Sequence, residues 1–223
     1  MRAVIFDFDG VLVDSEPLHF QSLGEAMRPE GITVTREAYF GKYLAFDDRG
    51  AIRRVLEDHG IFPDAERMER IALRKEARFA DVLKGVSFFP GARDLVGALA
   101  ARVPLGIASG ARHAEIEAIL AAGGLREPFP VIVGADDVPR TKPDPAPYLL
   151  AARQLTAFAP GLEPGDCLAF EDSVPGIASA LAAGMKVVGV AHSYPPAKLR
   201  SAHRVVESLV GLEHDGLRAL FEG

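Results

Sequence analysis

The chain has 223 residues, of which 48% are hydrophobic and 25% charged, and it carries a formal net charge of −6 at pH 7, so it can bury a substantial core in one domain or two small ones. The acidic balance disfavours a nucleic-acid partner, because basic clusters supply most of the affinity for a phosphate backbone. The apolar runs are too short to span a membrane and the N-terminus lacks the pattern of a secretory leader, so we expect a cytoplasmic protein without a membrane partner.

The first expected element is a buried strand at 3–6 (AVIF), and two acidic residues, Asp7 and Asp9, follow it. Alternate side chains of an extended chain point to the same face, so we expect these carboxylates to lie close together, with a positive group between them. Asp14 and Ser15 are typical N-terminal caps, and they precede a helix that Pro17 is expected to start.

Helical patterns then fill the chain up to about residue 84, in EPLHFQSLGEAM, DDRGAIRRVLEDHG and DAERMERIALRKEARFADVL. The next buried strand is expected only at 104–108, which is far more chain than a single crossover needs. We therefore predict a small helical domain at 15–85, inserted into a second domain made of 1–14 and 86–223. Within the insert, the turn residues and mixed charge of FGKYLAFDDRG favour a loop.

Strands and helices alternate along the rest of the chain. Short apolar runs predict buried strands at 104–108, 131–133, 167–170 and 186–190, and the only cysteine, Cys167, is expected to be buried in one of them. Helical patterns lie at 92–101, 111–123, 146–155 and 174–184, and several of them end in glycine. This alternation predicts an α/β fold with a doubly wound parallel sheet.

Polar residues recur where four of the expected strands end, which is where open α/β sheets bind their ligands. These residues are, in chain order, Asp7 and Asp9, then Ser109 and Gly110, then Lys142 and Pro143, then Glu171 and Asp172. Taken singly, each has an ordinary interpretation as a helix cap or a solvated side chain. Their recurrence at four strand ends indicates one site.

The chemistry of these residues suits a metal ion and a phosphate group. The carboxylates of Asp7, Asp9 and Asp172 are the hard oxygen donors that Mg²⁺ prefers. The hydroxyl of Ser109 and the N–H groups of Gly110 and Ala111 are expected to form an anion cradle at a helix N-terminus. Lys142 adds a point charge for a phosphate oxygen.

The segments DFDGVLVDSE, IASGA, TKPDP and FEDSVPGIASALAAGMKVVGV together resemble the haloacid dehalogenase superfamily, in the branch of phosphoglycolate phosphatases and β-phosphoglucomutase, over essentially the whole chain. The resemblance implies that Asp7 is the nucleophile that forms an aspartyl-phosphate and that Asp9 is the general acid and then the base. It implies that Ser109 and Lys142 hold the phosphoryl group. It also implies Mg²⁺ held by Asp7, the backbone carbonyl of Asp9 and Asp172, with Glu171 acting directly or through water.

The same resemblance implies that the helical insert is a cap that closes over the active site and carries substrate selectivity. His19 and Lys75 fall where β-phosphoglucomutase has a cap histidine and a cap lysine, and their ordinary interpretations are a surface histidine and a solvated lysine. Lys42 and Arg49, in FGKYLAFDDRG, are candidates to bind a substrate carboxylate or sugar hydroxyls.

The favoured function is that of a Mg²⁺-dependent phosphatase acting on a small phosphorylated metabolite, either phosphoglycolate or a sugar phosphate. A phosphomutase of the β-phosphoglucomutase type is an alternative with the same catalytic residues, although FGKYLAFDDRG departs from the loop expected of a mutase. A non-catalytic phosphometabolite sensor is disfavoured because a pure binder would not need Asp9, and a haloalkanoate dehalogenase because that branch lacks the second aspartate. A monomer is the default expectation.

Overall fold

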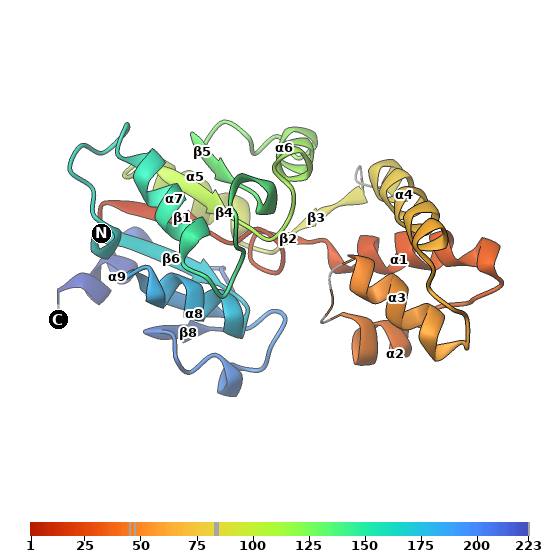
Figure 1. Cartoon of the computed structure of the whole chain (residues 1–223). Helices are drawn as coiled ribbons and strands as arrows, with labels where there is room; N and C mark the ends of the chain where they lie inside the picture. Colours follow the sequence, from red (N-terminus) through yellow and green to blue (C-terminus); the bar gives the residue numbers. More distant parts are fainter. Residues whose placement is uncertain (45, 47, 83–84, 223) are drawn as a thin grey trace. The chain divides into compact units, whose positions relative to one another are not determined.

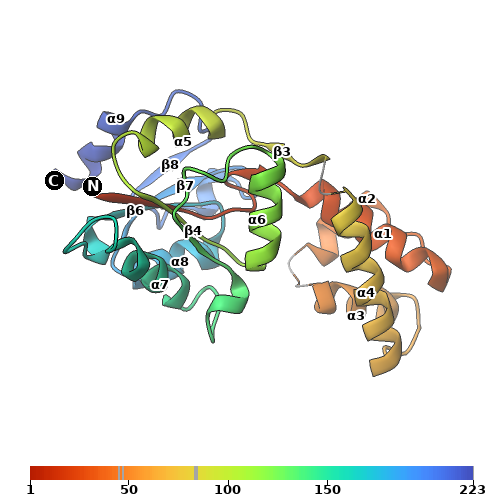
Figure 2. The same cartoon turned by 90° about the horizontal axis from the view of Figure 1, so that it is seen from above.

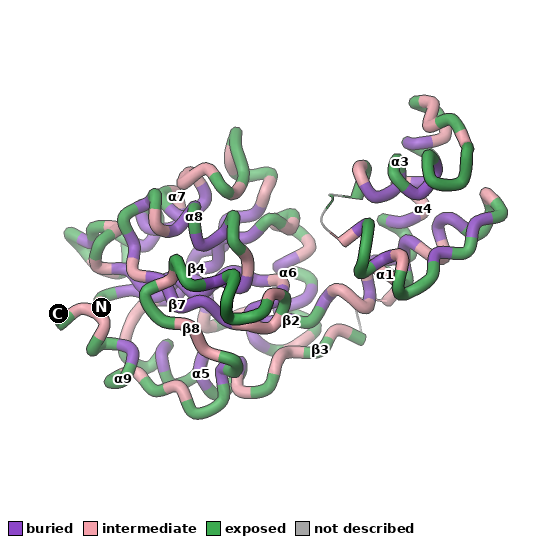
Figure 3. The backbone as a smooth tube through the Cα atoms, turned by 90° about the horizontal axis from the view of Figure 1, so that it is seen from below, coloured by how far each residue is buried: buried purple, intermediate pink, exposed green. Residues whose placement is uncertain are grey.

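The computed structural model describes residues 1–44, 46, 48–82 and 85–222. The chain forms two compact units, one of Met1–Asp14 and Ser87–Gly223 and the other of Ser15–Val86 (Figure 1). Each has its own buried interior, as the burial colours along the backbone show (Figure 3). Among the described residues, none of the helices combines the length and the apolar composition that crossing a bilayer requires.

In the described part of the first unit, six parallel strands form one sheet in the order β5-β4-β1-β6-β7-β8. Their bounds are β1 Ala3–Phe6, β4 Leu105–Ala108, β5 Val131–Val133, β6 Cys167–Glu171, β7 Lys186–Val190 and β8 Arg204–Val206. The central strand β1 pairs with β4 through Ile5 and Gly106 and with β6 through Ile5 and Ala169. The predicted doubly wound parallel sheet is therefore confirmed.

Helices cover both faces of this sheet, which is why its inner strands are apolar throughout. Helices α5 (Ala92–Ala100) and α9 (His214–Arg218) lie on one face, and α7 (Ala146–Leu155) and α8 (Val174–Ala182) on the other (Figure 2). A further helix, α6 (His113–Ala122), packs beside β5. Cys167 is buried in β6, as its apolar neighbours predict.

The edge strand β8 and the short antiparallel pair β2 (Val13–Asp14) and β3 (Ser87–Phe88) were not expected from the sequence. In β8 the side chains are only partly buried, so no continuous apolar run marks it. Each strand of the pair has two residues, which is too short for a hydrophobic period to be visible.

The second unit consists of helices around an apolar cluster. They are α1 (Glu16–Met27), α2 (Arg36–Ala38), a π-helical turn (Tyr39–Tyr43), α3 (Asp48–Asp58) and α4 (Ala65–Val82). Leu23, Ile52 and Ile71 are among the fully buried members of the cluster. Asp64 caps α4, because its carboxylate accepts the Arg67 N–H at 2.8 Å.

The prediction of a plain loop at FGKYLAFDDRG is wrong where the structure describes it. Its first residues lie in the π-helical turn and its last ones open α3, while positions 45 and 47 lie outside the described residues. The physical reason is that Tyr39 and Tyr43, four residues apart, bury their rings in the cluster and so hold this segment as a helical turn.

Candidate active site

Five of the residues expected at the strand ends lie at the carboxyl edge of the sheet. Asp7 follows β1, Ser109 follows β4, and Glu171 and Asp172 end and follow β6, with β1 lying between the other two strands. The exposed fractions of these four residues are only 7%, 2%, 0% and 5%. Lys142 reaches them from the segment between β5 and α7, so one group combines residues that are far apart in sequence.

The ammonium of Lys142 is the centre of this group. Its Nζ lies 2.8 Å from Asp7 Oδ1 and 2.6 Å from Glu171 Oε1. Burial lowers the pKa of Lys142, but the charges of Asp7 and Glu171 outweigh burial and raise that pKa above its usual value. Lys142 is therefore held as a cation, and it supplies the positive partner that the sequence led us to expect beside Asp7.

The Glu171 carboxylate is held on both of its oxygens. Tyr148 in α7 donates its hydroxyl to Oε1 at 2.8 Å. Ser173 donates to Oε2 from its hydroxyl at 3.0 Å and from its N–H at 3.3 Å. A Cβ added at Gly176, in the first turn of α8, would lie 2.0 Å from this carboxylate. The helix N-terminus therefore approaches Glu171 closely, and its dipole favours the negative charge there.

Asp7, Glu171 and Asp172 offer oxygen atoms that all lie within 4.8 Å of one another. Burial and the charge of Glu171 hold the pKa of Asp7 well above its usual range, and the same two causes raise that of Asp172 to about 7. Within this group, three carboxylates face the one ammonium of Lys142. Hard oxygen donors with excess negative charge are what Mg²⁺ requires, so these residues fit that ion.

Asp9 does not belong to the three carboxylates that the described structure brings together as a possible metal group. The extended chain ends at Phe6, and the backbone turns back over the next residues, with the N–H groups of Leu12 and Val13 donating to the Phe8 carbonyl. Gly10 takes a left-handed conformation at φ +79° inside this turn. Strand β1 therefore ends before Asp9, so strand alternation alone does not place its side chain, and the pairing of Asp7 with Asp9 stays a prediction.

The anion cradle expected after β4 differs in one respect. Helix α6 begins only at His113, so Gly110 and Ala111 lie in the preceding loop. The Ala111 N–H is not free, since it donates to Ser109 Oγ at 3.0 Å. The loop is fixed instead by contacts with the loop after β5, including Ala135 N–H to the Ala111 carbonyl at 2.8 Å. The Ser109 hydroxyl, which accepts from Ala111, keeps its own proton to donate.

In the second unit, His19 and Lys75 contact each other directly. Lys75 is 2% exposed, and its Nζ lies 2.5 Å from Asp48 Oδ1 and 3.1 Å from His19 Nδ1. The His19 ring stacks on Phe79 with 4.3 Å between ring centroids. Burial and the charge of Lys75 lower the pKa of His19 to about 4, so the imidazole is neutral and accepts from the ammonium. The ordinary interpretation of Lys75 as a solvated side chain is wrong.

Lys42 and Arg49 are not part of that cluster of contacts. Lys42 pairs with Asp58 at 3.6 Å, and Arg49 pairs with Glu69. Each of these two cationic side chains is 61% exposed.

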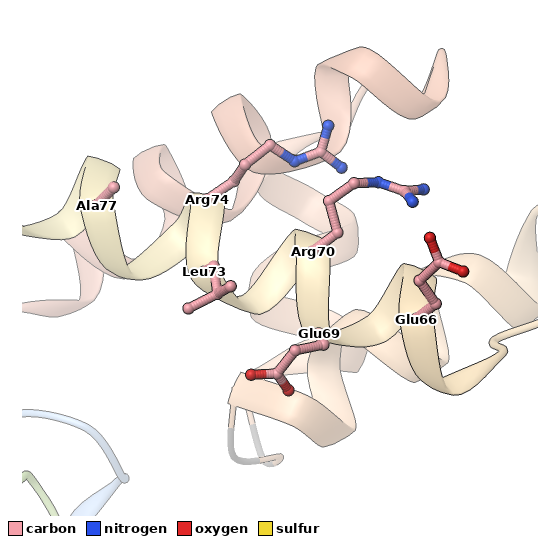
Figure 4. A pocket seen from close by; sticks show the side chains of 6 residues that line it. All are labelled: Glu66, Glu69, Arg70, Leu73, Arg74 and Ala77. Atoms are coloured by element: carbon pink, nitrogen blue, oxygen red, sulfur yellow. The ribbon is translucent and has the colours of Figure 1, made fainter.

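A surface pocket in the second unit lies along a single helix, α4. Six described residues line it, namely Glu66, Glu69, Arg70, Leu73, Arg74 and Ala77 (Figure 4). Glu69 in this lining is already paired with Arg49. The pocket includes none of the residues predicted for the active site, so we do not assign it a part in catalysis.

Three residues near the carboxyl edge were missed by sequence reasoning, namely Tyr148, His192 and Ser193. Tyr148 belongs to the apolar pattern of a helix and gave no polar signal. His192 and Ser193 follow β7, a fifth strand end that could have been included with the other four.

Comparison with known proteins gives a consistent picture. A family model described as haloacid dehalogenase-like hydrolase matches residues 4–190. Protein CbbY of Rhodobacter capsulatus is 32% identical, with 84% of each chain covered. A phosphoglycolate phosphatase of Rhodospirillum rubrum is also 32% identical, covering 86% of this chain and 80% of its own. Fructose-1-phosphate phosphatase YqaB of Escherichia coli is 33% identical, covering 84% of this chain and 95% of its own.

Solved structures agree with these relatives. CbbY from Rhodobacter sphaeroides, in complex with phosphate, superposes with a TM-score of 0.83 at 28% identity, covering 97% of this chain and 99% of its own. A putative β-phosphoglucomutase from Thermotoga maritima superposes with a TM-score of 0.79, also at 28% identity, covering 100% of this chain and 99% of its own.

Proposed function

The chain belongs to the haloacid dehalogenase-like hydrolase family and is a phosphoric monoester hydrolase, and we propose that it hydrolyses a small phosphomonoester with Mg²⁺ through an aspartyl-phosphate on Asp7. The observation that carries this proposal is the buried group of Asp7, Lys142, Glu171 and Asp172 at the strand ends. Relatives named as phosphatases of phosphoglycolate and of fructose 1-phosphate support these two classes of substrate.

In the proposed first step, a carboxylate oxygen of Asp7 attacks phosphorus and forms a new O–P bond while the ester O–P bond breaks. The leaving alcohol takes its proton from Asp9. Lys142, which lies 2.8 Å from the nucleophile, would pair with a phosphoryl oxygen and hold the group in line. The Ser109 hydroxyl would donate to a second phosphoryl oxygen. In the second step, Asp9 takes a proton from a water molecule, and the water oxygen attacks phosphorus. The bond between phosphorus and the Asp7 oxygen breaks, which releases phosphate and restores the free Asp7 carboxylate.

Mg²⁺ would be held by Asp7, Asp172 and the backbone carbonyl of Asp9, with Glu171 acting directly or through water. When bound, it supplies positive charge that offsets the repulsion between the Asp7 carboxylate and the phosphate dianion. The excess of carboxylates over ammonium groups in this part of the described structure supports that assignment.

We further propose that the second unit, which the sequence predicts as a helical domain at residues 15–85, is a cap that selects the substrate.

One observation in this unit favours a second candidate function, that of a β-phosphoglucomutase-type phosphomutase. Lys75 is buried and joined to His19 at the positions where that enzyme has its cap lysine and histidine. The segment FGKYLAFDDRG argues for the phosphatase, since it departs from the expected mutase loop.

The proposal is tested by phosphate release from a panel of phosphomonoesters that includes phosphoglycolate, fructose 1-phosphate, glucose 6-phosphate and β-glucose 1-phosphate, each with Mg²⁺ and with EDTA. Release that requires Mg²⁺ and is strongest on one small ester is expected. Conversion of β-glucose 1-phosphate into glucose 6-phosphate after priming with a bisphosphate, without net release, would instead establish the mutase. Silence in both assays would contradict the proposal.

A further inference from the structure

The loop after β7 reaches the same edge of the sheet as the proposed active site. Strand β7 runs parallel to β6, with Gly189 paired to Glu171, so His192 and Ser193 follow it beside Asp172. Neither residue has a part in the chemistry described above.

Ser193 shows that this loop touches the metal-binding side chains. Its hydroxyl hydrogen-bonds to the Asp172 carboxylate. A Cβ added at Gly10 would lie 2.0 Å from Asp172 Oδ2 and 2.8 Å from Ser193 Oγ. The loop after β7, the loop after β6 and the turn after β1 therefore meet at one point, and Gly10 has no space for a side chain there.

His192 makes two directional contacts at this meeting point. Its Nδ1 lies 2.9 Å from the Gly10 carbonyl oxygen, and because a carbonyl can only accept, Nδ1 carries the proton. The ring also stacks on Phe89, with 3.9 Å between centroids and 22° between planes. Phe89 in turn donates its N–H to the Leu12 carbonyl at 2.9 Å.

These contacts connect the turn of residues 8–13 to His192 in the loop after β7 and to Phe89. Inside the turn, Gly10 N–H donates to the Val13 carbonyl at 2.9 Å, and the left-handed Gly10 sets the direction of its peptide groups. The Asp9 carbonyl, proposed as a metal ligand, belongs to the peptide unit that ends at Gly10. The orientation of this carbonyl is therefore tied to the position of Gly10.

We propose that His192 is a positioning residue, whose Nδ1–H fixes the Gly10 peptide and thereby orients the backbone carbonyl of Asp9 toward the metal site. This inference rests on the proposed function, since it deepens the assignment of that carbonyl as a ligand. Hydrogen bonds to groups around a metal typically change affinity or activity by about 10-fold to 100-fold when they are removed.

Two matched variants separate the donor from the ring. His192→Asn keeps an N–H near the position of Nδ1 and loses the stack on Phe89, whereas His192→Phe keeps a ring and loses the donor. Ser193→Ala, on the same loop, removes the hydrogen bond to Asp172 and leaves His192 unchanged. His192→Leu, which also lacks the donor, replaces His192→Phe if that variant does not fold. The measurements are the Mg²⁺ dissociation constant by calorimetry, kcat and KM on the best phosphomonoester, and Tm.

We expect His192→Phe to weaken Mg²⁺ binding and to lower kcat by about 10-fold each, with KM changed by less than about 2-fold, because phosphate contacts are made elsewhere. His192→Asn should retain both values within about 3-fold of the wild type despite a lower Tm, since the donor remains. Ser193→Ala should weaken Mg²⁺ binding by about 3-fold.

Wild-type Mg²⁺ affinity in His192→Phe, or an equal loss in both His192 variants, would overturn the inference and leave only a packing role. If His192→Phe does not fold, wild-type Mg²⁺ affinity in His192→Leu would overturn it. A wild-type protein that binds Mg²⁺ but releases no phosphate would contradict the proposed function, while the calorimetric comparison would still decide the role of His192.

Discussion

Lys142 Nζ lies 2.8 Å from Asp7 Oδ1, and both side chains are almost completely withdrawn from solvent. The same ammonium lies 2.6 Å from Glu171. A buried cation between two buried carboxylates offsets charge that would otherwise be costly to bury. We therefore propose two roles for Lys142, stabilising the folded site before substrate arrives and pairing with the phosphoryl group afterwards.

Replacing Lys142 with methionine is expected to cost about 3 to 5 kcal/mol of stability in EDTA, because the carboxylates lose their cation. Mg²⁺ should restore part of that loss, whereas kcat should remain about 100-fold or more below wild type. Urea unfolding with and without Mg²⁺ measures the first effect, and phosphate release the second. Lys42→Met is the matched control for stability, since Lys42 is exposed and its ion pair with Asp58 is 3.6 Å long. A change above about 0.5 kcal/mol in the free energy of unfolding of Lys42→Met would undermine the comparison.

Tyr148→Phe removes the hydroxyl that donates to Glu171 at 2.8 Å and leaves a buried carboxylate with one donor fewer. We expect a loss of about 1 to 3 kcal/mol in the free energy of unfolding and a fall in kcat of about 3-fold to 10-fold, because Glu171 helps to hold Lys142. Tyr43→Phe, which removes a hydroxyl bonded to Asp58 at 3.1 Å, is the control and should cost under about 1 kcal/mol. Equal kcat in Tyr148→Phe and the wild type would show that this hydrogen bond does not support catalysis.

Gly176→Ala and Gly97→Ala compare two glycines inside helices. A Cβ at Gly176 would lie 2.0 Å from the Glu171 carboxylate, whereas at Gly97 in α5 nothing lies within 4 Å. Gly176→Ala should therefore destabilise the protein by about 1 to 3 kcal/mol and reduce activity, because the helix or Glu171 must move. Gly97→Ala should be neutral or stabilising by up to about 1 kcal/mol. Thermal unfolding of the two variants, measured side by side, compares their stabilities. Wild-type stability in both variants would contradict the close approach of α8 to Glu171.

The order and class of the main elements could be predicted from the sequence because the inner strands, and the edge strand β5, are buried on both faces. The runs at 3–6, 131–133 and 186–190 have the same bounds as β1, β5 and β7. The edge strand β8 could not be predicted this way, since its side chains are only partly buried. The turn at Tyr39–Tyr43 depends on two rings buried against other helices, which local composition does not reveal.

The residue types of the candidate site could also be predicted, because each follows an apolar strand. Their pairing could not. That Lys142 contacts Asp7 and Glu171 depends on the path of a segment with no regular period, and the Tyr148 hydroxyl is hidden in an apolar helical pattern. The side chain of Asp9 cannot be placed by strand alternation, because β1 ends at Phe6 and the chain turns at Gly10.

The pKa of His19, lowered to about 4 by burial and by the charge of Lys75, gives a pH dependence. In the unfolded chain the imidazole takes up a proton near its ordinary pKa of about 6.5, whereas in the folded chain it stays neutral down to about 4. The stabilising contribution is therefore full above about pH 6.5 and is lost as pH falls toward 4, by up to about 1.4 kcal/mol per pH unit.

Urea unfolding at several pH values between 7 and 4.5 measures this effect, with His19→Gln as the comparison. The difference in the free energy of unfolding between the wild type and His19→Gln should shrink as pH falls. A difference that is constant across this range would contradict a His19 that stays neutral in the folded chain.

A phosphoryl group on Asp7 is detected by rapid acid quench followed by mass spectrometry of the peptide that contains Asp7, with Mg²⁺ and the preferred phosphomonoester. Replacing Asp9 with alanine should slow the hydrolysis of the intermediate, so this variant is used beside the wild type. We expect one added phosphoryl group on Asp7 in the Asp9→Ala protein and none in Asp7→Asn, which should fold normally and lose activity by about a thousandfold or more. Mg²⁺-dependent turnover that persists in Asp7→Asn would contradict Asp7 as the nucleophile.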